Sequence, residues 1–137
     1  MEQAERITMN FATMVQELFE AIKRKDLQRL LSLISVDEDV CQILLNGAPI
    51  NGRSAFINLQ TAWFADPDWQ LEYQIVRTIE TAEMAYALLL VQYSDTTLRD
   101  EPYDKQHYLS LVFTRKGGSA NAEGTWSLVH DQTTIVL

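Results

Sequence analysis

The spacing of hydrophobic residues changes once along this sequence, from a helical period in the first half to a strand period in the second. Ile7, Phe11, Met14, Leu18 and Ile22 recur at steps of three and four, which is typical of one face of an amphipathic helix. In the second half, apolar residues alternate with polar ones, as in strands. A run of helices followed by a run of strands predicts an α+β fold.

Two further helices are expected before the change of period. Asp26 can cap a second helix, whose apolar face lies within 27–34. A short strand is predicted at 40–45, because this apolar run lies between polar segments. Gly52 opens a third helix, and Pro67 ends it because proline cannot continue a helix.

Four long strands are predicted at 69–80, 84–93, 107–115 and 124–136. We expect one curved antiparallel sheet, with the three N-terminal helices folded onto its inner face. The strand at 84–93 is apolar on both faces, and the helices can cover only one of them. A second copy of the chain on the outer face would cover the other, so the sequence predicts a homodimer.

The 137 residues fit a single domain spanning 1–137. A net charge of −8 argues against binding nucleic acid or an anionic membrane surface. The start of the sequence lacks the basic and apolar stretches of a signal peptide, which predicts a cytoplasmic location. One cysteine excludes an internal disulfide, and the two histidines lack metal-ligand spacing, so neither a metal nor a cofactor is expected.

The order of elements and three short motifs carry a family resemblance. Trp126 and His130 match a C-terminal strand pattern in which Gln132 and Thr134 replace a common histidine and serine. The segments 15–27 and 52–56 resemble the first helical region and the start of the third helix. The chain thus resembles the nuclear transport factor 2-like superfamily, in its SnoaL-like and ketosteroid-isomerase-like branches. That resemblance implies a cystatin-like cone with a ligand cavity, in proteins that range from isomerases and cyclases to non-catalytic modules.

The same resemblance allows one reaction to be tested. The positions that correspond to the tyrosine, the base and the protonated aspartate of ketosteroid isomerase are held here by Leu18, Ile43 and Leu109. None of these side chains can move a proton or donate to an oxyanion, and the neighbouring Gln42 cannot serve as a base. Steroid isomerisation is therefore not expected.

Strand alternation selects candidate site residues. Arg77 shares parity with Tyr73 and could grip an anionic ligand such as a carboxylate, or it could lie at the sheet end in an ion pair. His130 and Gln132 share parity with Trp126; His130 is a candidate acid or base, or a purely structural histidine.

Aromatic residues provide further candidates. Trp63, Tyr73, Tyr86 and Tyr93 could stack on a ligand or belong to the core, and His107 is expected at the cavity rim. The favoured function is binding of a small molecule, apolar or carboxylate-bearing. The alternative is a lyase- or isomerase-like enzyme that acts on a small, anionic or polyketide-like substrate through His130. A cone filled with side chains would instead indicate a protein–protein module.

Overall fold

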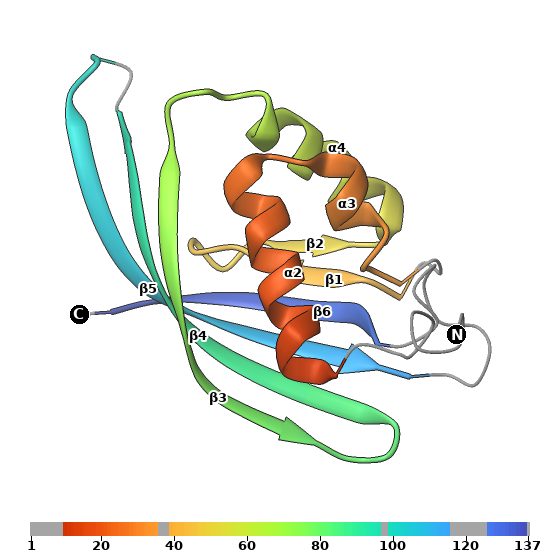
Figure 1. The fold of residues 1–137 in the computed structure, drawn as a ribbon. Helices are drawn as coiled ribbons and strands as arrows, with labels where there is room; N and C mark the ends of the chain where they lie inside the picture. The colour runs from red at the N-terminus through yellow and green to blue at the C-terminus, as the bar shows by residue number, and fades with distance from the viewer. Residues whose placement is uncertain (1–9, 36–38, 97–98, 116–125, 137) are drawn as a thin grey trace, which may run out of the picture.

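The computed structural model describes residues 10–35, 39–96, 99–115 and 126–136, and shows helices packed on one side of a bent sheet (Figure 1). Helix α2 spans Phe11–Arg24, and its predicted beginning at Ile7 lies outside the described residues. Asn10 caps it by accepting a hydrogen bond from the amide of Thr13 at 2.8 Å, which satisfies one of the free amides of the first turn. The helix ends at Lys25, which adopts the left-handed conformation with φ of 58°.

Helix α3 spans Leu27–Leu31 and begins, as predicted, at Asp26. The carboxylate of Asp26 accepts a hydrogen bond from the amide of Arg29 at 3.1 Å. The helix is shorter than the predicted segment 27–34. Its last predicted residue, Ile34, instead forms an isolated parallel bridge with Leu128, which ties the end of the helical region to the sheet.

Helix α4 spans Arg53–Phe64 and begins at Gly52, as predicted. Gly52 has φ of 94°, a conformation that a residue with a Cβ adopts only with strain, so glycine is required at this turn into the helix. The helix faces the core with Phe56, Phe64 and one polar residue, Gln60. In the part of the chain that the structure describes, no helix has the length and apolar character needed to cross a membrane.

The sheet contains six strands in the spatial order β2-β1-β6-β5-β4-β3. The four long strands are the predicted meander, and they pair in antiparallel fashion. The predicted strand at 40–45 is shorter, forms a hairpin with a strand that was not predicted, and joins β6 in parallel. The strands are β1 (Cys41–Ile43), β2 (Pro49–Asn51), β3 (Gln70–Glu80), β4 (Met84–Thr96), β5 (Pro102–Thr114) and β6 (Ser127–Ile135).

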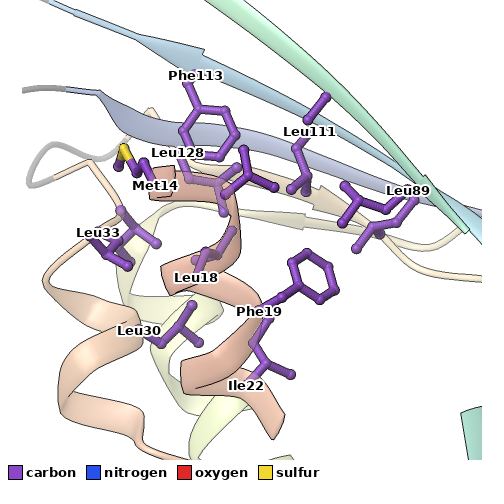
Figure 2. Packing of buried hydrophobic residues seen from close by; sticks show 14 of the residues in the cluster. Met14, Leu18, Phe19, Ile22, Leu30, Leu33, Leu89, Leu111, Phe113 and Leu128 are labelled. Carbon is purple, nitrogen blue, oxygen red and sulfur yellow. The ribbon is translucent and has the colours of Figure 1, made fainter. Parts of the chain in front are cut away.

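Helices α2, α3 and α4 lie on the inner face of the curved sheet, so the core forms between the two layers (Figure 1). Side chains of α2 such as Leu18 and Phe19 point toward Leu89, Leu111 and Leu128 of the sheet (Figure 2). All five residues are buried. Burial of side chains of this size stabilises the fold by roughly 1.5–3 kcal/mol each, which is why helices and sheet fold as one unit.

A bulge in β3 changes which face its residues occupy. Ile75 pairs with Leu89 on β4, whereas Arg77 pairs with Leu88, so Val76 is an extra residue without a partner of its own. Because side chains alternate between faces with a period of two, one extra residue reverses the alternation beyond it. Residues after the bulge therefore face the side opposite to the one that simple counting predicts.

A second bulge lies in β6. Leu128 pairs with Phe113 on β5, and His130 pairs with Val112, so Val129 is the extra residue. Leu128 and Phe113 are buried on the inner face. From His130 onward the even-numbered residues face outward, and the odd-numbered residues turn toward the helices.

Candidate functional site

A cavity of about 310 Å³ lies between the helices and the inner face of the sheet. Its volume is at the lower end of the roughly 300–1,000 Å³ typical of small-molecule sites. Most of its wall is aliphatic or aromatic, and side chains from α2, α3, α4, β1 and β3 to β6 line it. The apolar lining includes Leu18, Phe19, Ile22, Leu30, Leu44, Leu45, Phe56, Leu59, Trp63, Leu71, Val91, Leu109, Leu111 and Leu128.

Three polar residues from three elements meet on the cavity wall. Asp131 of β6 and Gln42 of β1 are register partners, so they lie side by side on the same face. The amide nitrogen Nε2 of Gln42 lies 3.5 Å from Asp131 Oδ2, at the outer limit of a hydrogen bond. Gln60, buried on α4, donates from its Nε2 to Gln42 Oε1 at 3.0 Å. The two amides thus connect α4 to the carboxyl group.

The carboxyl group of Asp131 is poorly compensated for its burial. Its Oδ1 atom is buried and has no hydrogen-bond partner among the described residues. Burial raises the pKa of Asp131 from 3.8 to about 7, because the charged form loses its hydration. Near neutral pH this group can therefore exist in either protonation state, as a hydrogen-bond donor or as a buried anion.

An aromatic cluster forms another part of the wall. Trp63 and Tyr93 line the cavity, and Trp63 stacks on Trp69 with ring centroids 4.2 Å apart. Tyr93 Oη accepts a hydrogen bond from Trp63 Nε1 at 3.3 Å and donates one to Asp95 at 2.9 Å. These bonds fix both rings, and burial raises the pKa of Tyr93, which keeps the phenol neutral.

His107 and Lys105 of β5 also line the cavity. Burial lowers the pKa of His107, and the nearby charge of Lys105 lowers it further, so the imidazole is neutral at neutral pH. Its Nδ1 atom is buried without a hydrogen-bond partner among the described residues. Over the same residues, no cluster of three or more His, Cys, Asp or Glu side chains is arranged to hold a metal ion.

Three of the residues predicted as ligand contacts, Trp63, Tyr93 and His107, lie on the cavity wall. The expected placement of His130 and Gln132 there is wrong, because the bulge at Val129 turns them to the outer face. Their pairing partners show this directly: Gln132 pairs with Ser110, whereas its neighbour Asp131 pairs with buried Leu111.

The expected placement of Arg77 is also wrong. It lies beyond the bulge at Val76, pairs with Leu88, and is exposed on the outer face. Tyr86 lies on that outer face too, since its neighbours Ala85 and Ala87 are buried on the inner one.

Tyr73 faces the helices but does not line the cavity. Its ring packs against Phe19 with centroids 5.0 Å apart, and its hydroxyl donates to Glu20 of α2 at 2.9 Å. Burial, and then this hydrogen bond, raise its pKa to about 12. Tyr73 therefore joins α2 to β3, and this position gives its predicted role in ligand stacking no support.

Asp131, Gln42 and Gln60 were not predicted as site residues. Gln60 was detectable, because it is a polar residue one turn from Phe56 and Phe64 on the buried face of α4. Asp131 has the opposite parity to Trp126 and His130, and only the bulge at Val129 turns it to the inner face.

Of the positions that correspond to catalytic residues of ketosteroid isomerase, Leu18 and Leu109 line the cavity as apolar wall. Ile43 pairs with outward-facing Gln132, and it is Gln42 that faces the interior.

An α+β cone with an internal cavity is the architecture of nuclear transport factor 2-like proteins. A model of the SnoaL-like domain family matches residues 12–136, and the chain belongs to this family within that superfamily. No protein of curated function matches the chain.

Solved structures show the same fold at low sequence identity. A protein proposed to be a calcium/calmodulin-dependent protein kinase type II association domain, from Thiobacillus denitrificans, has a TM-score of 0.75 and 17% identity over 96% of this chain and 98% of its own. A proposed dehydratase of the NTF2-like family from Streptomyces avermitilis has a TM-score of 0.74 and 15% identity over 92% and 93%. A ketosteroid isomerase-like protein from Erwinia carotovora atroseptica has a TM-score of 0.73 and 12% identity over 92% and 93%. At these identities the likeness extends to the fold alone.

Proposed function

We propose that this domain binds a small molecule, of mainly apolar character and with one polar group, in the cavity between its helices and sheet. The observation that carries the proposal is the meeting of an apolar wall with one buried, unpaired carboxyl oxygen, Asp131 Oδ1. Sites for small molecules commonly combine apolar walls with a few polar groups that fix orientation. The sequence also predicted a ligand that carries a carboxylate, with Arg77 as its binding partner. Arg77 lies on the face opposite to the cavity, so this part of the prediction has no support.

Filling the cavity tests this function. A fragment library is screened by ligand-observed NMR against the native chain and against Val91→Phe, which adds a ring to a buried wall residue. Val112→Phe is the matched control, because Val112 pairs with outward-facing His130. We expect fragments to bind the native chain and the control and to lose binding to Val91→Phe. Since overpacking can unfold a core, Leu59→Phe at a half-buried wall position is a second test. Binding that survives in folded forms of both cavity variants would overturn the proposal.

One observation favours an enzymatic alternative. A general acid or base works best when its pKa is near the working pH, and burial places the pKa of Asp131 at about 7. In a lyase- or isomerase-like reaction, Asp131 would take the acid–base role that the sequence assigned to His130. Asp131→Asn should then lower the rate by about 10²–10⁴-fold, with His130→Ala near the native rate. Turnover that survives Asp131→Asn would exclude this alternative.

We also propose that two copies of the chain associate through the outer face of the sheet. Ile79, Met84 and Tyr108 are exposed there, each by more than a third of its surface. In the central part of this face, the outward residues of β4 and β5 within 86–90 and 108–112 carry no charge. Two chains of net charge −8 can therefore meet there without bringing acidic groups together.

A further inference from the structure

The unpaired Asp131 oxygen has few groups in the protein that could neutralise it. Asp131 is flanked by Gln42 on β1 and Leu111 on β5, and Gln60 of α4 reaches it only through Gln42. Its pKa is raised by burial, and among the described residues its Oδ1 atom has no hydrogen-bond partner. Of the ionisable residues in the described cavity wall, the other three are His107, Lys105 and Tyr93.

None of those three residues supplies the missing positive charge. Burial keeps His107 and Tyr93 neutral at neutral pH. The ammonium group of Lys105 lies over the ring of Tyr103, 5.4 Å from its centroid. Its charge lowers the pKa of His107, whereas the pKa of Asp131 is raised by burial. The position beside Asp131 is therefore suited to a positive charge that comes with a ligand.

The remaining wall is compatible with a cation on an apolar body. Trp63 and Tyr93 offer aromatic rings, whose faces attract cations. His107 Nδ1 is a second buried atom without a partner, and in the tautomer that carries its proton on Nε2 it accepts a hydrogen bond. An ammonium group has three donors and no acceptor, which suits Asp131 Oδ1. His107 pairs with Ile135, four residues along β6 from Asp131, so its Nδ1 is an acceptor for another part of the ligand.

We propose that the ligand of this cavity is an amine: an apolar, aromatic-sized body with a protonated nitrogen that donates to Asp131 Oδ1. This inference rests on the proposed ligand-binding function and specifies its chemistry. A ligand carboxylate would be repelled by ionised Asp131. A neutral hydroxyl or carbonyl group can accept a hydrogen bond from protonated Asp131, but it leaves the ionised form uncompensated.

Amine binding should be coupled to release of a proton. A cation stabilises the ionised carboxylate, so an ammonium ligand binds the deprotonated form of Asp131 and displaces the proton that burial favours. With a pKa of about 7, the ionised fraction rises about ten-fold between pH 6 and pH 8. Amine affinity should therefore rise by about ten-fold over this interval, and the affinity of a neutral analogue should not.

Three probes of the same body and different head group test the proposal: 2-phenylethylamine, 2-phenylethanol and phenylacetate. Binding to the full chain is measured by isothermal titration calorimetry at pH 6 and pH 8, in buffers of different ionisation enthalpy. We expect the amine to bind at least about ten-fold more tightly than the alcohol at pH 8, and to release a proton at pH 6. Asp131→Asn should abolish both effects and keep alcohol binding. His130→Gln, on the outer face of the same strand, should keep all of them.

The outcomes separate the ligand class from the function. If the alcohol or phenylacetate binds as tightly as the amine at pH 8, or if Asp131→Asn keeps the amine advantage, the amine proposal is wrong and a cavity that binds ligands remains. If none of the probes binds, the amine proposal is also wrong, and the fragment screen with Val91→Phe decides independently whether the cavity binds anything.

Discussion

At the scale of single residues, burial of Asp131 lowers the stability of the folded domain by an amount that depends on pH. The folded state holds a proton on this carboxyl up to a pKa of about 7, whereas the unfolded chain releases it near 3.8. A raised pKa in the folded state means that the contribution of Asp131 to stability is most favourable below pH 4, falls as pH rises from 4 to 7, and is constant above it. The same lone carboxyl that destabilises the free domain is the feature on which the proposed function depends.

Asp131→Asn should therefore stabilise the domain at alkaline pH. Asparagine has nearly the shape of the protonated side chain and never ionises. We expect the free energy of unfolding to match the native value near pH 4 and to exceed it by roughly 2–4 kcal/mol at pH 8. Urea denaturation of both proteins at pH 4.5, 6 and 8 measures the difference between their free energies of unfolding. Other titrating groups contribute equally to both proteins, so they do not affect this difference. If this difference does not grow with pH, the pKa of Asp131 is not raised in the folded state.

Gln60 allows a second test, which concerns the hydrogen bonds that link Gln60 to Gln42 and Gln42 to the carboxyl group of Asp131. Gln60→Leu leaves Gln42 Oε1 without its donor at 3.0 Å, and an unsatisfied buried acceptor costs about 1–3 kcal/mol. Asn58→Leu is the matched control on the exposed side of α4, where we expect a change within about 0.5 kcal/mol. Chemical denaturation compares the two variants. Equal effects of both substitutions would mean that the Gln60–Gln42 bond does not stabilise the fold.

At the scale of elements, hydrophobic period and caps predicted most of the architecture. Local sequence rules predicted helices that begin at Asp26 and Gly52, and four long strands. All of these elements are present. The β2 strand and the parallel pairing of β1 with β6 depend on contacts between segments far apart in sequence, which local patterns do not encode.

The candidate site was predicted less well, and two single residues explain why. Alternation gave Arg77 the parity of Tyr73 and His130 the parity of Trp126, which made both candidates for the cavity, and the bulges at Val76 and Val129 turn both to the outer face. Each bulge falls at two consecutive aliphatic residues, Ile75-Val76 and Leu128-Val129, which interrupt strict alternation. That interruption is the sequence signal of the bulges, although neighbouring aliphatic residues also occur in strands without one, as in β4. Trp63 lies on a helix, where strand alternation does not apply, and His107 lies in an unbroken stretch of pairing between β4 and β5; both line the cavity.

The end of α2 provides a prediction at this scale. Lys25 has φ of 58°, in the region that favours glycine, while its Nζ donates to the Asp66 carbonyl at 2.7 Å and lies 4.1 Å from the centre of the Trp69 ring. Lys25→Ala and Lys25→Gly both remove these contacts, but only glycine relieves the backbone. We expect Lys25→Gly to be more stable than Lys25→Ala by about 1 kcal/mol in thermal or urea unfolding. The reverse order would indicate that this helix end is not strained.

At the scale of the whole molecule, the two faces of the sheet have separate roles. The inner face forms the cavity with the helices, and the outer face is not covered by them (Figure 1). The bulges contribute to this separation, because they place Asp131 inside and keep Arg77 and His130 on the outer face. A change to one face can therefore be examined without altering the other.

Tyr108→Glu tests the proposed dimer on that basis. Tyr108 is 38% exposed and pairs with outward-facing Leu90 and Thr134, so it lies within the uncharged centre of the outer face. A carboxylate there would be desolvated against a second copy that carries the same charge, which favours dissociation. Leu45→Glu is the control, because Leu45 is exposed to nearly the same extent, 37%, but lies at the cavity. In sedimentation velocity we expect the native chain and Leu45→Glu at twice the 15.7 kDa chain mass, and Tyr108→Glu at the chain mass itself. A native chain that sediments as a monomer, or a Tyr108→Glu variant that stays dimeric, would show that the exposed tyrosine and its apolar neighbours are not the contact between copies.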